Sequence, residues 1–138
     1  MTVVNSLLGR VHLSGRLDLL SPHQLELISS GMKVYKSIRS GLKTGLPFWP
    51  LGLPTWHDDW VALGIATTDG DHYLSVWRRG GSDSISLPIL TLKGKSVKVD
   101  LLYPEKFQAS AEWDSSKGAL SVGISSAIAA RLFRLHVS

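Results

Sequence analysis

The sequence predicts a mixed fold, in which one strand–helix unit of the kind that builds a (β/α)8 barrel is followed by an all-β antiparallel sandwich. Two observations support this prediction. In the N-terminal third, apolar residues recur at the spacing of an amphipathic helix, and after Asp59 they alternate with polar residues at the two-residue period of strands. A segment rich in proline and tryptophan separates the two patterns. We therefore expect three parts: the end of a barrel in 1–40, an ordered linker in 41–58 and a sandwich domain in 59–138.

An apolar run in residues 7–13 predicts the strand of the barrel unit. A strand of such a barrel is buried on both faces and pairs with parallel neighbours. No second strand–helix unit precedes it in the sequence. We therefore expect the rest of the barrel to lie outside this chain, and the chain to be the C-terminal end of a larger protein.

The helix of this unit is predicted over Ser21–Ser40, with signals at both ends. Ser21 is a suitable N-cap, Pro22 fits the first helical position and Gln24 completes a capping box. Gly41 is a typical residue to follow the C-terminal end of a helix. We therefore expect the helix to stop at Ser40.

One face of the predicted helix is apolar, and it is formed by Leu25, Ile28, Met32 and Tyr35. Gly31 interrupts the helix at a cost of about 1 kcal/mol relative to alanine. A glycine at this place indicates a close contact between the helix and a sheet.

The linker is constrained by three prolines. Pro47, Pro50 and Pro54 exclude a continuous helix or a central strand. Trp49 and Trp56 need other groups to pack on, which argues against a flexible tether. We therefore expect an ordered segment between the helix and the sandwich.

Residues 59–138 contain about seven short strands separated by turn signals, which is typical of an antiparallel sandwich. The expected strands carry Val61, Leu63 and Ile65; Leu74 and Val76; Ile85, Leu87 and Ile89; Val97, Val99 and Leu101; Phe107, Ala109, Ala111 and Trp113; Leu120, Val122 and Ile124; and Ile128 to Val137. The expected turns include Asp69-Gly70, Gly80–Asp83 and Ser115–Gly118.

The charge and composition of the chain argue against several kinds of functional site and partner. The net charge is +4, and the positive excess follows the predicted helix rather than a stripe with base-reading partners, so we favour a solvated helix over a nucleic-acid interface. The absence of cysteine excludes a disulfide framework, a thiolate metal site and a thiol nucleophile. The five histidines show no metal-binding spacing. No stretch approaches the roughly 20 apolar residues of a membrane span. We expect no metal, cofactor, nucleic acid or membrane partner, and the sequence does not indicate a compartment.

Five motifs carry a resemblance to a known family. They are Gly9-Arg10-Val11-His12-Leu13-Ser14-Gly15, Tyr35-Lys36-Ser37-Ile38-Arg39, Pro47-Phe48-Trp49-Pro50-Leu51-Gly52-Leu53-Pro54, Trp60-Val61-Ala62-Leu63-Gly64 and Tyr73-Leu74-Ser75-Val76-Trp77-Arg78-Arg79. Together they resemble the C-terminal end of α-galactosidase-type glycoside hydrolases, family thirty-six of the melibiase clan. The resemblance implies a catalytic barrel that ends near Ser40, followed by a β-sandwich. It also implies hydrolysis of terminal α-galactosides without a cofactor.

The same resemblance implies that no catalytic residue lies in this chain. In that family two aspartates at the ends of middle barrel strands act as nucleophile and acid/base in a retaining mechanism, and neither position falls here. The close carboxylate pairs of the chain are Asp58-Asp59 and Glu112/Asp114. Because both stand next to turns or on a solvent face, we expect them to have turn or capping roles rather than the cleft geometry of a glycosidase.

Two groups of residues are candidates for binding sugar. Ser14, Gly15 and Arg16 follow the predicted barrel strand, so they would line the sugar site of the full enzyme or only shape the loop into the helix. Trp49, Trp56 and Trp60 would form an aromatic platform with His57 and Asp58 as polar partners, or would pack between barrel and sandwich.

The partners follow from these interpretations. We expect the chain to bind the missing barrel of the same protein and, through the full enzyme, carbohydrate. We also expect the chain by itself to self-associate. The alternative interpretation is a free-standing β-sandwich that binds carbohydrate or another protein.

Overall fold

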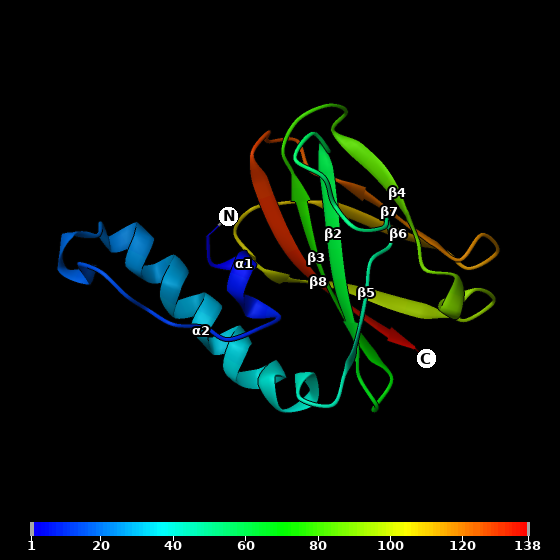
Figure 1. The fold of residues 1–138 in the computed structure, drawn as a ribbon, viewed down its shortest axis with the longest axis horizontal. Helices are drawn as coiled ribbons and strands as arrows, with labels where there is room; N and C mark the ends of the chain where they lie inside the picture. The colour runs from blue at the N-terminus through cyan, green and yellow to red at the C-terminus, as the bar shows by residue number, and fades with distance from the viewer. Residues whose placement is uncertain (1, 138) are drawn as a thin grey trace.

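Two antiparallel sheets and a long helix make up the computed structural model, which describes residues 2–137 (Figure 1). The five-stranded sheet has the order β1 (Leu46–Phe48), β2 (Trp60–Ala66), β3 (Asp71–Arg78), β8 (Ala129–Val137) and β5 (Val97–Tyr103). The three-stranded sheet has the order β4 (Ser84–Pro88), β7 (Ala119–Gly123) and β6 (Ser110–Asp114). The helices are α1 (Val4–Leu7) and α2 (Pro22–Leu42), with short 3₁₀ turns at Leu17–Leu19 and Leu90–Leu92. Every strand pair is antiparallel, so the predicted sandwich is confirmed.

The main core lies between the two sheets. Leu74 of β3 and Phe133 of β8 are paired in register and fully buried. They face Leu120 and Val122 of β7, which are equally buried. The two-residue alternation therefore produces one apolar inner face on each sheet, as strand geometry requires.

A second, smaller core lies on the other face of the five-stranded sheet. Tyr73, Tyr103 and Leu132 point away from the sandwich core and are buried beneath the helices. Leu7 of α1 and Ile38 of α2 cover them. The central strands are thus buried on both faces, and the molecule has the layer order helix, sheet, sheet.

The predicted strand in residues 7–13 is wrong for this chain. The structure has the short helix α1 at Val4–Leu7, and residues 8–16 form no regular element. A barrel strand needs parallel neighbours to pair its backbone groups, and all strand pairs in residues 2–137 are antiparallel pairs of the sandwich. Without such neighbours, Val4 and Leu7 gain burial by packing on the sheet as one helical turn.

The predicted helix is confirmed, with its N-terminus as expected. The backbone N–H of Gln24 donates to Ser21 Oγ at 3.3 Å, and the N–H of Ser21 donates to Gln24 Oε1 at 2.9 Å, which completes the capping box. The predicted C-terminus is wrong, because Gly41 lies inside the helix, which ends at Leu42. Leu42 packs at the edge of the second core, and this contact favours the two additional helical residues.

Gly31 makes the close contact that the sequence indicates. A Cβ atom at this position would lie 2.5 Å from Val3 Cγ1 and 3.2 Å from Tyr103 Cε2. The helix therefore approaches the sheet more closely here than any larger residue would allow.

The proline-rich segment contributes an edge strand. Pro47 of β1 pairs with Ile65 of β2 at the border of the sheet, where a missing N–H is tolerated. The ring of Phe48 covers Gly64, where a Cβ atom would lie 2.1 Å from Phe48 Cζ. This contact ties the linker to the sandwich.

The N-cap gives a first testable expectation. The N-terminal end of α2 extends away from the sheets (Figure 1). It is tied to the sandwich by the ion pair between Lys106 and Glu26 at 2.6 Å and by the hydroxyl of Tyr103, which donates to the Leu27 carbonyl at 3.1 Å. Ser21→Ala removes the capping bond and should destabilise this end of the helix by about 1 kcal/mol. Amide hydrogen exchange at residues 24–28 should accelerate accordingly. Ser29→Ala, an exposed change on the same helix, is the control, and equal exchange in both variants would contradict the capping role.

Candidate functional site

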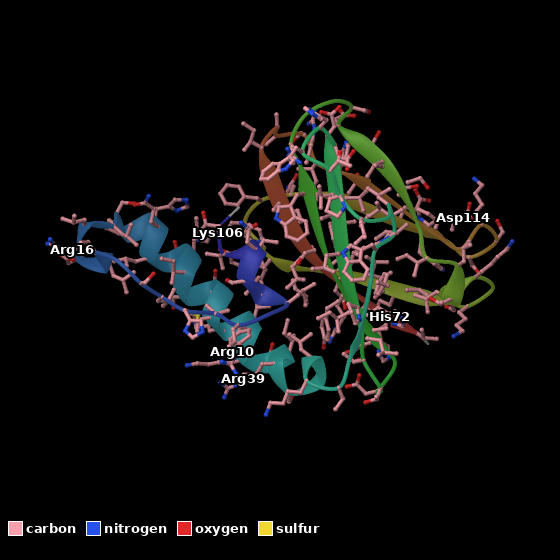
Figure 2. All side chains as sticks on the ribbon, in the orientation of Figure 1. Arg10, Arg16, Arg39, His72, Lys106 and Asp114 are labelled. Atoms are coloured by element: carbon pink, nitrogen blue, oxygen red, sulfur yellow. The ribbon has the colours of Figure 1, made fainter. Side chains whose placement is uncertain are left out.

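The residues expected near the sugar lie on an exposed loop at the far end of the helical layer. Ser14, Gly15 and Arg16 are all exposed, and Figure 2 shows Arg16 at the end of the molecule opposite Asp114. Gly15 has φ +100°, a conformation that favours glycine. The Arg16 guanidinium lies 2.6 Å from the Asp18 carboxylate and lowers the pKa of that carboxyl. The structure brings the three residues together on one loop.

An apolar groove of about 630 Å³ runs beside this loop. We call it the N-terminal groove; it is lined by Val3, Val11, Leu13, Leu17, Leu20, Leu27, Ile28, Met32 and Tyr103 with five polar residues. Leu13 on one side is 50% exposed, and Leu25 on the neighbouring helix face is 43% exposed. Of the apolar helix face predicted from the sequence, Ile28, Met32 and Tyr35 are only half-buried. The N-terminal half of α2 thus carries an apolar face that residues 2–137 cover only in part.

The predicted platform of three tryptophans is wrong in one member. Trp60 is buried in the main core, where its indole N–H donates to the Ser82 carbonyl at 3.1 Å. Trp49 and Trp56 are exposed, Trp56 at 88%. Arg79 donates to the backbone carbonyl of Trp56 and so fixes the loop that carries this indole. Only Trp49 and Trp56 remain available to a ligand.

One member of each carboxylate pair, Asp58 or Asp114, has local hydrogen-bond partners. Asp58 accepts from the backbone N–H of Thr55 at 2.6 Å, as in a tight turn. Asp114 accepts from the hydroxyl of Ser116 at 2.6 Å and from the N–H of Lys117 at 3.0 Å. These bonds lower the pKa of Asp114 to about 2. A carboxyl held in this state is a turn residue and a poor proton donor.

This pKa gives an expectation for acid stability. The folded-state pKa of Asp114 lies below the value of about 3.9 for an unfolded aspartate, so its contribution is present above pH 4 and is lost as the pH falls towards 2. Asp114→Asn should lower Tm at neutral pH and flatten the fall of Tm between about pH 4 and pH 2. Glu112→Gln on the same strand is the control, because Glu112 is exposed and has no ion-pair partner within residues 2–137. An unchanged slope in Asp114→Asn would contradict this reasoning.

Two buried arginines were not singled out from the sequence. Arg78 donates to the carbonyls of Ile124 at 2.7 Å, Ser125 at 2.9 Å and Gly81 at 2.8 Å. It is 8% exposed, and the alternation of β3 places it on the same inner face as Leu74 and Val76. This inward position in the alternation of β3 is the sequence feature that could have identified Arg78 as a buried residue.

The second buried arginine lies on the neighbouring strand. Arg131 of β8 is 6% exposed and pairs in register with Val76, so it also points into the sandwich. It donates to the carbonyls of Phe107 at 3.1 Å and Gln108 at 3.3 Å. Burial of charged groups is costly unless their hydrogen bonds are satisfied, and here carbonyl oxygens satisfy them. The two guanidinium groups close one end of the sandwich.

Comparisons of the chain with protein families, with curated proteins and with solved structures give no match. Within residues 2–137, no three His, Asp or Glu side chains converge to form a metal site. None of the helices in the same range has the length and apolar character needed to cross a membrane.

Proposed function

We propose that this chain is the C-terminal part of an α-galactosidase-like glycoside hydrolase, in which the sandwich supports a (β/α) barrel that hydrolyses terminal α-galactosides by a retaining mechanism. The motif resemblance supports the family. The uncovered apolar face of α2 beside the N-terminal groove is the observation that carries the proposal. Such a face is unusual on a monomeric soluble protein and typical of a surface that another element covers.

A barrel supplies what this segment lacks. Parallel strands would pair the backbone of residues 7–13 and allow the strand that the chain by itself does not form. Neighbouring helices would cover Leu25 and the groove beside it. The sandwich would remain attached through the second core, in which Ile38 of α2 packs on the five-stranded sheet.

In this proposal the chain positions groups and performs no bond cleavage. Ser14, Gly15 and Arg16 would stand at the carboxyl end of the last barrel strand, where barrel enzymes bind their substrates. Arg16 would then bind sugar hydroxyls or keep its partner Asp18. We therefore expect the isolated chain to release no chromophore from a chromogenic α-galactoside. Turnover that disappears in Asp58→Asn or Asp114→Asn would contradict this assignment.

The test of the proposal is binding to a barrel. A family thirty-six α-galactosidase truncated before its last strand–helix unit is mixed with this chain, and complex formation is measured by size-exclusion chromatography. We expect a complex with the natural sequence and none with Leu13→Asp/Leu25→Asp. Leu90→Asp is the matched control, since Leu90 is 69% exposed and lies at a 3₁₀ turn outside the groove. A soluble barrel that forms no complex with the natural chain would contradict the proposal.

The uncovered face also predicts self-association of the isolated chain. Exposed leucines at positions 13, 19 and 25 favour contact with a second copy, because burial releases about 25 cal/mol per Å² of apolar surface. We expect light scattering to show a rise in mean mass with concentration. Leu13→Asp/Leu25→Asp should reduce this rise and Leu90→Asp should not. A natural chain that stays monomeric at high concentration would contradict the expectation.

The second candidate function is a free-standing sandwich that binds carbohydrate or a protein. The separate core between the two sheets favours it, because that core closes without the helices. It differs from the first candidate in requiring no barrel.

A further inference from the structure

One end of the sandwich carries a cleft of about 570 Å³ that the barrel proposal does not use. We call it the serine cleft. It lies where β4 begins, β7 ends and β6 begins, so that Ser84, Gly123 and Ser110 form one row across the three-stranded sheet. A Cβ atom at Gly123 would lie 2.3 Å from Ser110 Oγ, so glycine keeps this row open. The volume is within the range of ligand-binding clefts.

Both walls of the serine cleft are held by the buried arginines. Arg78 bonds the carbonyls of Ile124 and Ser125, which form one wall. Arg131 bonds the carbonyl of Gln108 in the other wall. The backbone of the cleft is therefore fixed before a ligand arrives, which lowers the entropic cost of binding.

The side chains of the cleft define the chemistry of its ligand. Asp83 and Glu105 are exposed there, and within residues 2–137 neither carboxylate has an ion-pair partner. Together with the Gln108 amide and the serine hydroxyls they offer many acceptors and several donors, while no lysine or arginine side chain lines the cleft. Leu101 and Ala109, both half-buried, add apolar surface. An anionic ligand is disfavoured by the two carboxylates.

We propose that the serine cleft binds a neutral oligosaccharide, at a site separate from any barrel chemistry. Hydroxyl donors of a sugar match the carboxylate and amide acceptors, and its C–H faces match the two aliphatic side chains. The two buried arginines position this site by holding its backbone and do not touch the ligand.

The test is a titration of the isotope-labelled chain, followed by amide chemical shifts, with four neutral probes: stachyose, maltotetraose, xylotetraose and mannotetraose. We expect at least one of them to shift amides in residues 83–84, 105–110 and 123–125. Asp83→Asn/Glu105→Gln should weaken that binding at least about tenfold, because hydrogen bonds to charged acceptors are lost. Gly123→Ala should also weaken the binding, because the added methyl group would occupy the space beside the Ser110 hydroxyl. Glu112→Gln, outside the cleft, should leave the binding unchanged.

The amide spectra of the variants also report whether each one folds. Absence of shifts with all four sugars, shifts confined to other residues, or a response only to the polyamine spermidine would overturn the proposal. None of these outcomes affects the barrel proposal, because the complex with the barrel is measured at the N-terminal groove.

Discussion

Arg78→Met should lower the free energy of unfolding by about 3–5 kcal/mol, since several carbonyl oxygens lose their donor at once. The bond to the Ile124 carbonyl is buried, and those to the Ser125 and Gly81 carbonyls are partly buried. Methionine keeps the apolar part of the side chain, so the change isolates the hydrogen bonds. Denaturant unfolding followed by fluorescence measures the effect.

Arg79→Met is the matched control for this expectation. Arg79 is the next residue, is exposed, and donates to Thr55 in a surface loop, so its replacement should cost less than about 1 kcal/mol. Equal losses in the two variants would show that the buried bonds of Arg78 have no special weight.

The second large effect is expected in the main core. Phe133 is fully buried between the sheets, and Phe133→Ala should cost about 3–5 kcal/mol through lost burial and the cavity left behind. Phe107→Ala is the control, because Phe107 is 41% exposed and should cost about 1 kcal/mol. A small loss for Phe133→Ala, measured by the same unfolding method, would contradict the assignment of the core.

The sandwich and the helix start were predictable because their signals are local. Alternation at Val97, Val99 and Leu101 gives β5, and the spacing of Ser21 and Gln24 gives the N-cap of α2. The state of residues 7–13 was not predictable, because an apolar run forms a barrel strand only where parallel neighbours pair its backbone. The same run therefore has a different structure in a chain without them.

The candidate site was less predictable than the fold. Trp60 and Val61 are both apolar and follow each other at the start of β2, so the pattern does not show which of them joins the main core. The roles of Arg78 and Arg131 depend on carbonyls that lie up to 47 residues away along the chain and meet only after folding. Sequence patterns do not show which distant residues come into contact in the folded chain.

We propose that this chain completes an α-galactosidase-like barrel, and hydrolysis of a chromogenic α-galactoside by the mixture of the truncated barrel and this chain tests this proposal most directly. We expect activity in the mixture, none in either component, and none when the chain carries Leu13→Asp/Leu25→Asp. Activity should persist with Leu90→Asp, whose position lies outside the N-terminal groove. A folded barrel piece that stays inactive with the natural chain, or that becomes active equally with Leu13→Asp/Leu25→Asp, would contradict the account.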